Sequence, residues 1–260
     1  MGQGRWIRLA GAIAGVLAAY VLSVWGEPGI APAFAVPALA ALLAAGLWLA
    51  DRTVARPAGA GVRTARLVRR RTLDLVPAGP VAGVMLLTVA LGGLLGVTGP
   101  ASTPHSRSAV LPNNSQDGRH IGCVSGGVAQ SGPWPGWFYA ITIGATLAVV
   151  AVVTVVALRR VLTRPVEGTA GDAYRQSTAN AIVSALGVLT AGTLGGAAYF
   201  THSILGQTGV CAEPVALATR PWLVALMIIA AAASAYYATR LVLPPSSPAA
   251  RLLGTAVATR

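Results

Sequence analysis

The sequence contains no lysine, and charged residues of any kind make up only 10% of its 260 residues. Hydrophobic residues make up 55%, and the mean hydropathy is +0.67. Because an average soluble domain has about 25% charged residues, this chain carries too little charge to cover a water-facing surface. The scarcity of charge excludes an ordinary soluble protein and indicates an integral membrane protein.

Ionisable residues also rarely interrupt the apolar sequence. A helix needs about 20 residues to cross ~30 Å of hydrocarbon at ~1.5 Å per residue. Stretches that lack Asp, Glu, Lys, Arg and His, apart from Arg8 and Arg240 at their ends, meet or approach that length near residues 7–25, 33–50, 78–98, 137–158, 179–200 and 222–240. We predict an all-α polytopic integral membrane protein, in which residues 1–260 form a single six-helix transmembrane domain of three antiparallel hairpins.

The tryptophans agree with these boundaries, because an indole ring prefers the membrane interface. All of them lie at or just outside the end of a predicted span: Trp6, Trp25, Trp48, Trp134, Trp137 and Trp222. A cleaved signal peptide is the alternative for the first span, since Arg5 and Arg8 precede its apolar run. The run meets Glu27 and Pro28 instead of an Ala-x-Ala site, so we expect a retained helix.

All nineteen basic residues are arginine, and they concentrate in alternate loops. Residues 51–76 form the most basic of these loops, whereas the loops on the opposite side hold only Arg107, Arg119 and Arg220. The positive-inside rule predicts that both termini and the basic loop 51–76 are cytoplasmic. The exclusive use of arginine, with abundant Ala, Val, Leu and Gly, is typical of a GC-rich bacterial genome. We therefore expect a multi-pass protein of the bacterial cell (plasma) membrane.

The basic loop has two interpretations. Its densest part carries Arg63, Arg66, Arg69, Arg70 and Arg71. Anionic headgroups attract such arginines by about 1 kcal/mol each, so a solvated, lipid-contacting segment that sets the topology is the first interpretation. A docking surface for a cytoplasmic partner is the second. A nucleic-acid partner is not expected, because no aromatic stacking set accompanies the arginines.

Only two cysteines are present, Cys123 and Cys211. The predicted topology puts both in extracytoplasmic loops, where disulfides persist. We predict that they form one structural disulfide, which would be worth about 4–5 kcal/mol in the chain-entropy model. Two free thiols are the alternative, and the absence of a Cys-x-x-Cys motif argues against a redox enzyme.

The predicted extracytoplasmic loop 101–136 is rich in Pro, Gly, Ser and Asn, so we expect it to be irregular and water-facing. It contains His105 and His120, and His202 lies at the outer end of the fifth span. Because no His-x-x-x-His spacing accompanies these histidines, we predict solvated or hydrogen-bonded side chains and no metal site.

The predicted spans have no carboxylate, histidine or arginine near their centres, although ion-coupled transporters usually keep one there. Their Thr and Ser hydroxyls can bond the carbonyl of the preceding turn. Glycine pairs at 11/15, 92/96 and 192/196 predict close helix contacts. Neither a G-x-S-x-G motif nor a P-loop is present. We therefore expect no enzymatic activity and no cofactor, and an ATP-driven role would need a separate ATPase chain.

Two stretches carry a resemblance. RRRTLDLVPAGP at 69–80 and DAYRQSTANAIVSALGVL at 172–189 resemble segments of uncharacterised actinobacterial multi-pass membrane proteins. The first stretch is also similar to the cytoplasmic loop of export-type permease subunits of ABC transporters, in which a basic, Thr-Leu-acidic motif precedes a proline and contacts the ATPase. The matching positions are Arg70, Arg71, Thr72, Leu73, Asp74 and Pro77. Asp74 replaces the usual Glu, and no basic residue follows Pro77 before the helix.

These observations leave two functional hypotheses. The first is a permease-like or accessory subunit of a membrane transport system, without chemistry of its own. The second is a non-transporting scaffold or signalling membrane protein whose disulfide-pinned outer face binds a partner.

Overall fold

Six long helices and one β-hairpin make up the computed structural model, which describes residues 2–24, 31–53, 78–102, 120–125, 128–163, 168–207 and 217–242. The helices are α1 (Gly2–Val24), α2 (Ala31–Thr53), α3 (Ala78–Ala101), α4 (Trp137–Thr163), α5 (Gly168–Gln207) and α7 (Arg220–Val242). The strands are β1 (His120–Ser125) and β2 (Val128–Pro133).

All six helices are long and apolar enough to cross a membrane, so the six predicted spans are confirmed and the chain is a multi-pass membrane protein. Helix α5 departs most from its predicted range of 179–200, because it contains 40 residues. At ~1.5 Å per residue it is about 60 Å long, twice the thickness of the hydrocarbon layer. Its ends therefore extend beyond the hydrocarbon.

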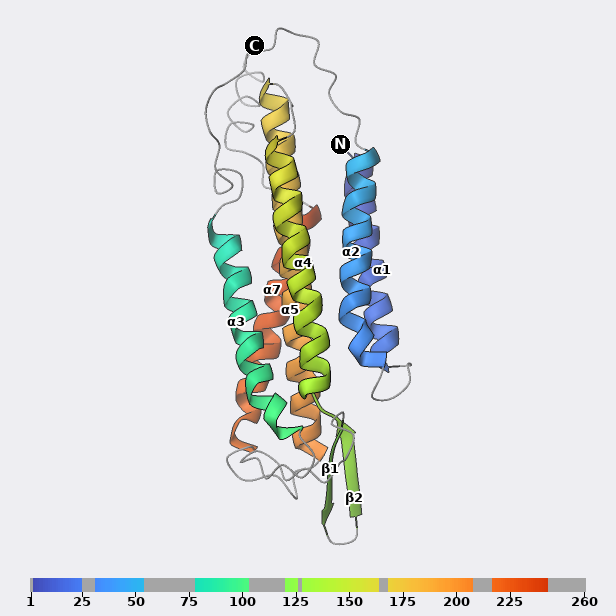
Figure 1. Cartoon of the computed structure of the whole chain (residues 1–260), viewed down its shortest axis with the longest axis vertical. Coiled ribbons are helices and arrows are strands. Elements are labelled where there is room, and N and C mark those ends of the chain that lie inside the picture. Colours follow the sequence, from blue (N-terminus) through green and yellow to red (C-terminus); the bar gives the residue numbers. More distant parts are fainter. Residues whose placement is uncertain are drawn as a thin grey trace, which may run out of the picture.

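The helices form two packed groups, which Figure 1 shows side by side. Helices α1 and α2 make one antiparallel pair, and α3, α4 and α7 surround α5 in the other group. Consecutive helices run antiparallel, as predicted. However, α3 contacts α5 more extensively than it contacts α4. The predicted hairpin of α3 and α4 is therefore held together mainly by the contacts of both helices with α5.

The two ends of the molecule differ in charge. At one end, which we call the arginine-rich end, α1, α3 and α5 begin and α2, α4 and α7 finish (Figure 1). The described arginines of that end are Arg5, Arg8, Arg52, Arg159, Arg160, Arg175 and Arg240. The opposite end, which we call the hairpin end, carries β1 and β2 and the described arginine Arg220. Arg52 stacks on Trp48, with its Cζ atom 3.9 Å from the ring centroid, which suits an anchor at the membrane interface.

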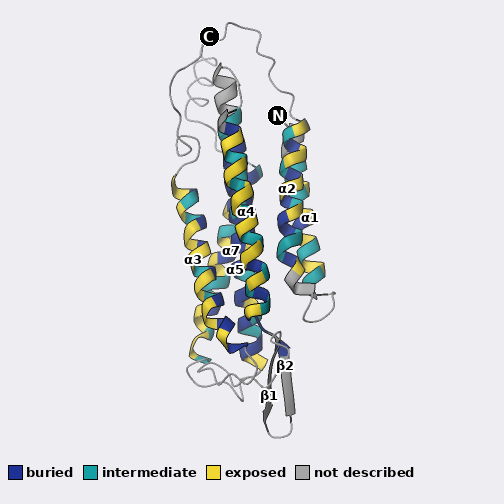
Figure 2. Cartoon of the chain, in the orientation of Figure 1, coloured by how far each residue is buried: buried dark blue, intermediate teal, exposed yellow. Residues whose placement is uncertain are grey.

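Helix α5 is the buried centre of the protein. Within its span window 72% of residues are buried, against 11% for α4, although α4 has the most apolar window of the six. Figure 2 shows the exposed residues of α4 along its outer surface. The buried positions of α5 are dominated by small residues, such as Ala179, Ala181, Ala191 and Ala197. Small side chains let neighbouring backbones approach closely, which is how helices associate in a membrane.

Glycines bring α1 and α2 into backbone contact. A Cβ atom added to Gly11 would lie 2.8 Å from the Cα atom of Gly46, and one added to Gly15 would lie 2.8 Å from a methyl carbon of Leu39. The close contact predicted for the 11/15 pair is therefore confirmed. The prediction was wrong for Gly92 and Gly96, because they face outward from α3 with no described atom within 4 Å of an added Cβ.

Tyr237 joins α3, α5 and α7. Its hydroxyl donates a hydrogen bond to the Pro80 carbonyl at 2.7 Å, and its ring lies over the backbone of Gly187. A Cβ atom added to Gly187 would lie 2.4–2.6 Å from three ring carbons of Tyr237. The missing side chain of Gly187 thus creates the space that the tyrosine occupies.

The expectation of an irregular segment at 101–136 was wrong for its second half. β1 and β2 pair antiparallel, with His120 opposite Pro133 and Cys123 opposite Gln130. The hairpin is held against α5 at Gly132, which is buried beside Ile204. Polar and glycine-rich composition favours loops, but it does not exclude a hairpin whose backbone hydrogen bonds are satisfied between its own strands.

We expect Gly187→Ala to destabilise the protein by about 1–3 kcal/mol, the usual cost of overpacking a filled core. The added methyl group must displace the Tyr237 ring and with it the hydrogen bond to Pro80. The measurement is the midpoint of thermal unfolding in mild detergent, and Gly96→Ala is the control because its Cβ meets open space. Equal midpoints for the two variants would contradict this packing.

Candidate binding cavity

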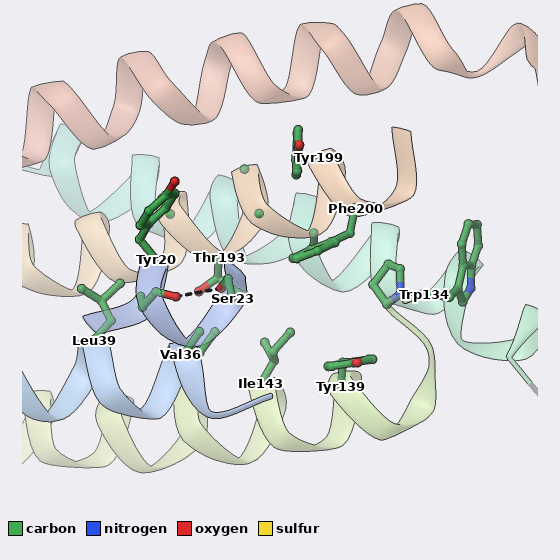
Figure 3. A pocket seen from close by; sticks show the side chains of 17 residues that line it. Tyr20, Ser23, Val36, Leu39, Trp134, Tyr139, Ile143, Thr193, Tyr199 and Phe200 are labelled. Carbon is green, nitrogen blue, oxygen red and sulfur yellow. Dashed lines mark hydrogen bonds between the residues drawn. The ribbon is translucent and has the colours of Figure 1, made fainter. Parts of the chain in front are cut away.

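A cavity of about 870 Å³ lies between the α1–α2 pair and helices α4 and α5. It is closed toward the hairpin end by Trp134 and Pro135, and Figure 3 shows its lining. The lining residues are Ala19, Tyr20, Ser23, Ala35, Val36, Leu39, Trp134, Pro135, Tyr139, Ile143, Gly192, Thr193, Gly195, Gly196, Ala197, Tyr199 and Phe200. Its volume falls within the range of about 300–1,000 Å³ that is typical of small-molecule sites.

Glycines of α5 provide much of this space. Gly192 and Gly196 were predicted to make a close helix contact, but instead they line the cavity. An added Cβ at Gly196 would have no described atom within 4 Å, and one at Gly192 would meet only a Leu39 methyl at 3.9 Å. Space therefore remains between the α1–α2 pair and α5 beside Gly192 and Gly196.

The polar groups of the cavity are few and uncharged. The Thr193 hydroxyl donates to the Leu189 carbonyl at 2.7 Å, and the Ser23 hydroxyl donates to the Ala19 carbonyl at 2.8 Å. Thr88, Thr142, Thr146 and Thr190 bond their own helices in the same way. The predicted pairing of hydroxyls with the preceding turn is confirmed at these positions. Among the residues that the structure describes, the cavity lining includes no acidic, basic or histidine residue.

A set of hydrogen bonds fixes the closed end of the cavity. The indole N–H of Trp134 donates to the Thr98 carbonyl at 2.8 Å, and the Thr98 hydroxyl donates to the Pro135 carbonyl at 2.6 Å. The Trp137 amide then donates to the Ser102 hydroxyl at 3.0 Å. These bonds connect the end of α3 to the start of α4. Trp134 is therefore buried in the protein, unlike Trp6, Trp48, Trp137 and Trp222, which are exposed near helix ends.

Helix α5 also carries a polar residue that the sequence analysis did not single out. Asn180 lies near the arginine-rich end of the predicted span and is 2% exposed. Its side-chain nitrogen is buried without a hydrogen-bond partner. The hydroxyl of Thr178, close by on the same helix, is also buried without a partner. An amide among buried positions of a span is the signal that could have identified it.

The residues predicted as sites lie mostly outside the part of the chain that the structure describes. Arg63, Arg66, Arg69, Arg70, Arg71 and Cys211 all lie outside the described residues. Cys123 is in β1. Because Cys211, its predicted partner, lies outside the described residues, the structure does not test the predicted disulfide. His105 is also outside the described residues, whereas His120 begins β1 and His202 is on α5. Among described residues no group of three or more His, Cys, Asp or Glu could hold a metal ion.

The lining of the cavity is the main feature that sequence reasoning missed. Trp134 suggested only an interfacial anchor, and the glycines of α5 suggested only helix contacts. Comparison with protein-family models, curated proteins and solved structures finds no match to this chain. The cavity must therefore be interpreted from its own chemistry.

We expect Asn180→Leu to leave the thermal unfolding midpoint unchanged or to raise it, because it removes a buried amide nitrogen that has no hydrogen-bond partner, at similar volume. Asn180→Asp should lower the midpoint, since a buried carboxylate without a partner costs far more. Both are measured in the same detergent. A clear loss of stability in Asn180→Leu would contradict the assignment of Asn180 as an unsatisfied group.

Proposed function

We propose that the chain is a permease-like or accessory subunit of a membrane transport system, without catalytic chemistry of its own. The observation that supports this proposal best is the cavity at the junction between two packed groups of helices. In many transporters, substrate sites lie where two such groups meet, and relative motion of the groups changes access to the site. A cavity inside one rigid bundle would support this role less well.

The contacts of the α1–α2 pair suit such a motion. At the arginine-rich end, the Tyr174 hydroxyl of α5 donates a hydrogen bond to the Asp51 carboxylate of α2. Toward the hairpin end, the same two helices are separated by the cavity. The pair is thus joined to α5 by a polar contact at one end and separated from α5 by the cavity toward the other, as a hinge requires.

Energy for transport would come from another chain. The described cavity lining has no carboxylate, arginine or histidine that could couple substrate to ions. The resemblance of residues 69–80 to the ATPase-contacting loop of export-type permeases implies a separate ATPase partner. With the arginine-rich end in the cytoplasm of a bacterial cell, Arg63, Arg66, Arg69, Arg70 and Arg71 would meet anionic headgroups or that ATPase.

We expect a P-loop ATPase to co-purify with the chain from membranes of its own host in mild detergent. Replacing Arg69, Arg70 and Arg71 together by Gln should reduce ATPase recovery while the membrane level of the chain stays normal, because the basic side chains contribute to docking. Quantitative mass spectrometry measures both amounts. Replacing Arg251 and Arg260 by Gln is the control for a general loss of charge. Unchanged ATPase recovery in the triple variant, or no ATPase in any preparation, would contradict the proposal.

A scaffold or signalling role is the second candidate, and the β-hairpin favours it. β1 and β2 form an ordered surface at this end of the protein, and Gly132 of β2 packs against α5. A disulfide between Cys123 and Cys211 would fix this surface further. The same purification without reductant tests this candidate: linked Cys123 and Cys211 peptides together with an extracytoplasmic partner would favour it over transport. Free thiols at both cysteines would remove its basis.

A further inference from the structure

The cavity is open to the side, between helices that face lipid. Tyr20 of α1 and Tyr199 of α5 both line it, and they are 59% and 56% exposed. Deeper lining residues such as Leu39, Ile143 and Thr193 are buried. Because Tyr20 and Tyr199 belong to membrane-spanning windows, the surface they share meets the bilayer. A molecule dissolved in the membrane can therefore reach the cavity without crossing water.

The described lining favours an uncharged occupant. An ionised group in a site of low dielectric needs an opposite charge or several hydrogen bonds, and the lining residues that the structure describes include no carboxylate, arginine or histidine. The Ser23 and Thr193 hydroxyls already donate to their own helices. The phenols of Tyr20 and Tyr199 also line the cavity, and both residues are more than half exposed.

The apolar interior of the cavity is unfavourable for water and unfavourable to leave empty. A buried water needs about two to four polar partners. The deep part of the cavity is formed by Leu39, Val36, Ile143, glycines and Thr193, whose hydroxyl already donates to the Leu189 carbonyl. If the cavity were empty, its lining would lose dispersion contacts. The fluid hydrocarbon at the opening can supply those contacts. From Phe200 to Gly192 the cavity follows α5 over about 12 Å at ~1.5 Å per residue. Its interior is thus long, apolar and accessible from the bilayer.

We propose that the cavity is a binding site for the hydrocarbon chain of a lipid from the leaflet at the hairpin end. The chain enters between Tyr20 and Tyr199 and extends toward Leu39 and Gly192. The two exposed phenols then lie beside the uncharged linkage of the lipid, where tyrosine side chains prefer to be. This site rests on the cavity alone and does not require the transport role.

Trp134 provides a direct test, because it lines the cavity and is 1% exposed. In a variant with Trp134 as the single tryptophan, the other five are replaced by Phe: Trp6, Trp25, Trp48, Trp137 and Trp222. The variant is reconstituted into phosphatidylcholine vesicles with or without bromine atoms on the acyl chains. Bromine quenches indole fluorescence on contact, so we expect Trp134 to lose most of its fluorescence in the brominated vesicles.

Two glycine variants separate the cavity from general lipid contact. In the single-tryptophan background, Gly196→Leu places a side chain in the path along α5 and should reduce the quenching. Gly96→Leu is the matched control, because its Cβ also meets open space but on the outer surface of α3, and it should leave the quenching unchanged. Gly192→Leu is a second variant that places a side chain in the cavity, and it is used if Gly196→Leu does not fold.

Three results would overturn the proposal. The first is no bromine quenching of Trp134, and the second is equal quenching in Gly196→Leu and Gly96→Leu. The third is quenching by aqueous iodide instead of bromine, which would mean a water-filled cavity. Lipid extracted from detergent-washed protein gives the source of the chain: enrichment of an acyl glycerolipid or of an isoprenoid, relative to Gly196→Leu, supports the site and identifies which one binds.

Discussion

The close approach of neighbouring helices to the small residues of α5 is the constraint on which the structure depends. In a bilayer, lipid tails are as apolar as leucine, so burying a large aliphatic side chain gives little advantage over leaving it in lipid. Tight contact between backbones is therefore the main source of association. Ala179, Ala191 and Ala197 allow this contact along α5, and Gly187 allows it beneath Tyr237. The most apolar span, α4, accordingly lies largely in lipid.

The same property of α5 has opposite effects at two levels. At Gly187 a neighbouring side chain fills the space that glycine leaves, so three helices are joined. At Gly192 and Gly196 no neighbour fills it, so a cavity remains between α5 and the α1–α2 pair. The difference lies in what faces each glycine: an aromatic ring of α7 in the first case, and mainly the single side chain of Leu39 in the second. Helix packing and ligand space thus arise from one sequence feature.

The six spans could be predicted because hydrophobic length is a local property of the sequence. The central position of α5 could not, since it depends on which helix the other helices contact. Gly11 and Gly92 belong to similar motifs, yet one contacts a helix and the other faces outward. Their partners, not their spacing, decide the outcome. The β-hairpin was missed because His120–Pro133 lacks the alternation of a typical strand, and Trp134 seemed interfacial because only its place in the sequence was known.

Labelling with a small apolar carbene dissolved in the bilayer tests the central role of α5 most directly. The unmodified protein is photolabelled in vesicles, and mass spectrometry measures the label on each helix. The structure predicts heavy labelling of α1 and α4, where 6% and 11% of the span residues are buried, and little labelling of α5, where 72% are. Residues 178–191 of α5, which do not line the cavity, should be protected most completely. Labelling of these residues as heavily as α4 would contradict the arrangement of helices around α5.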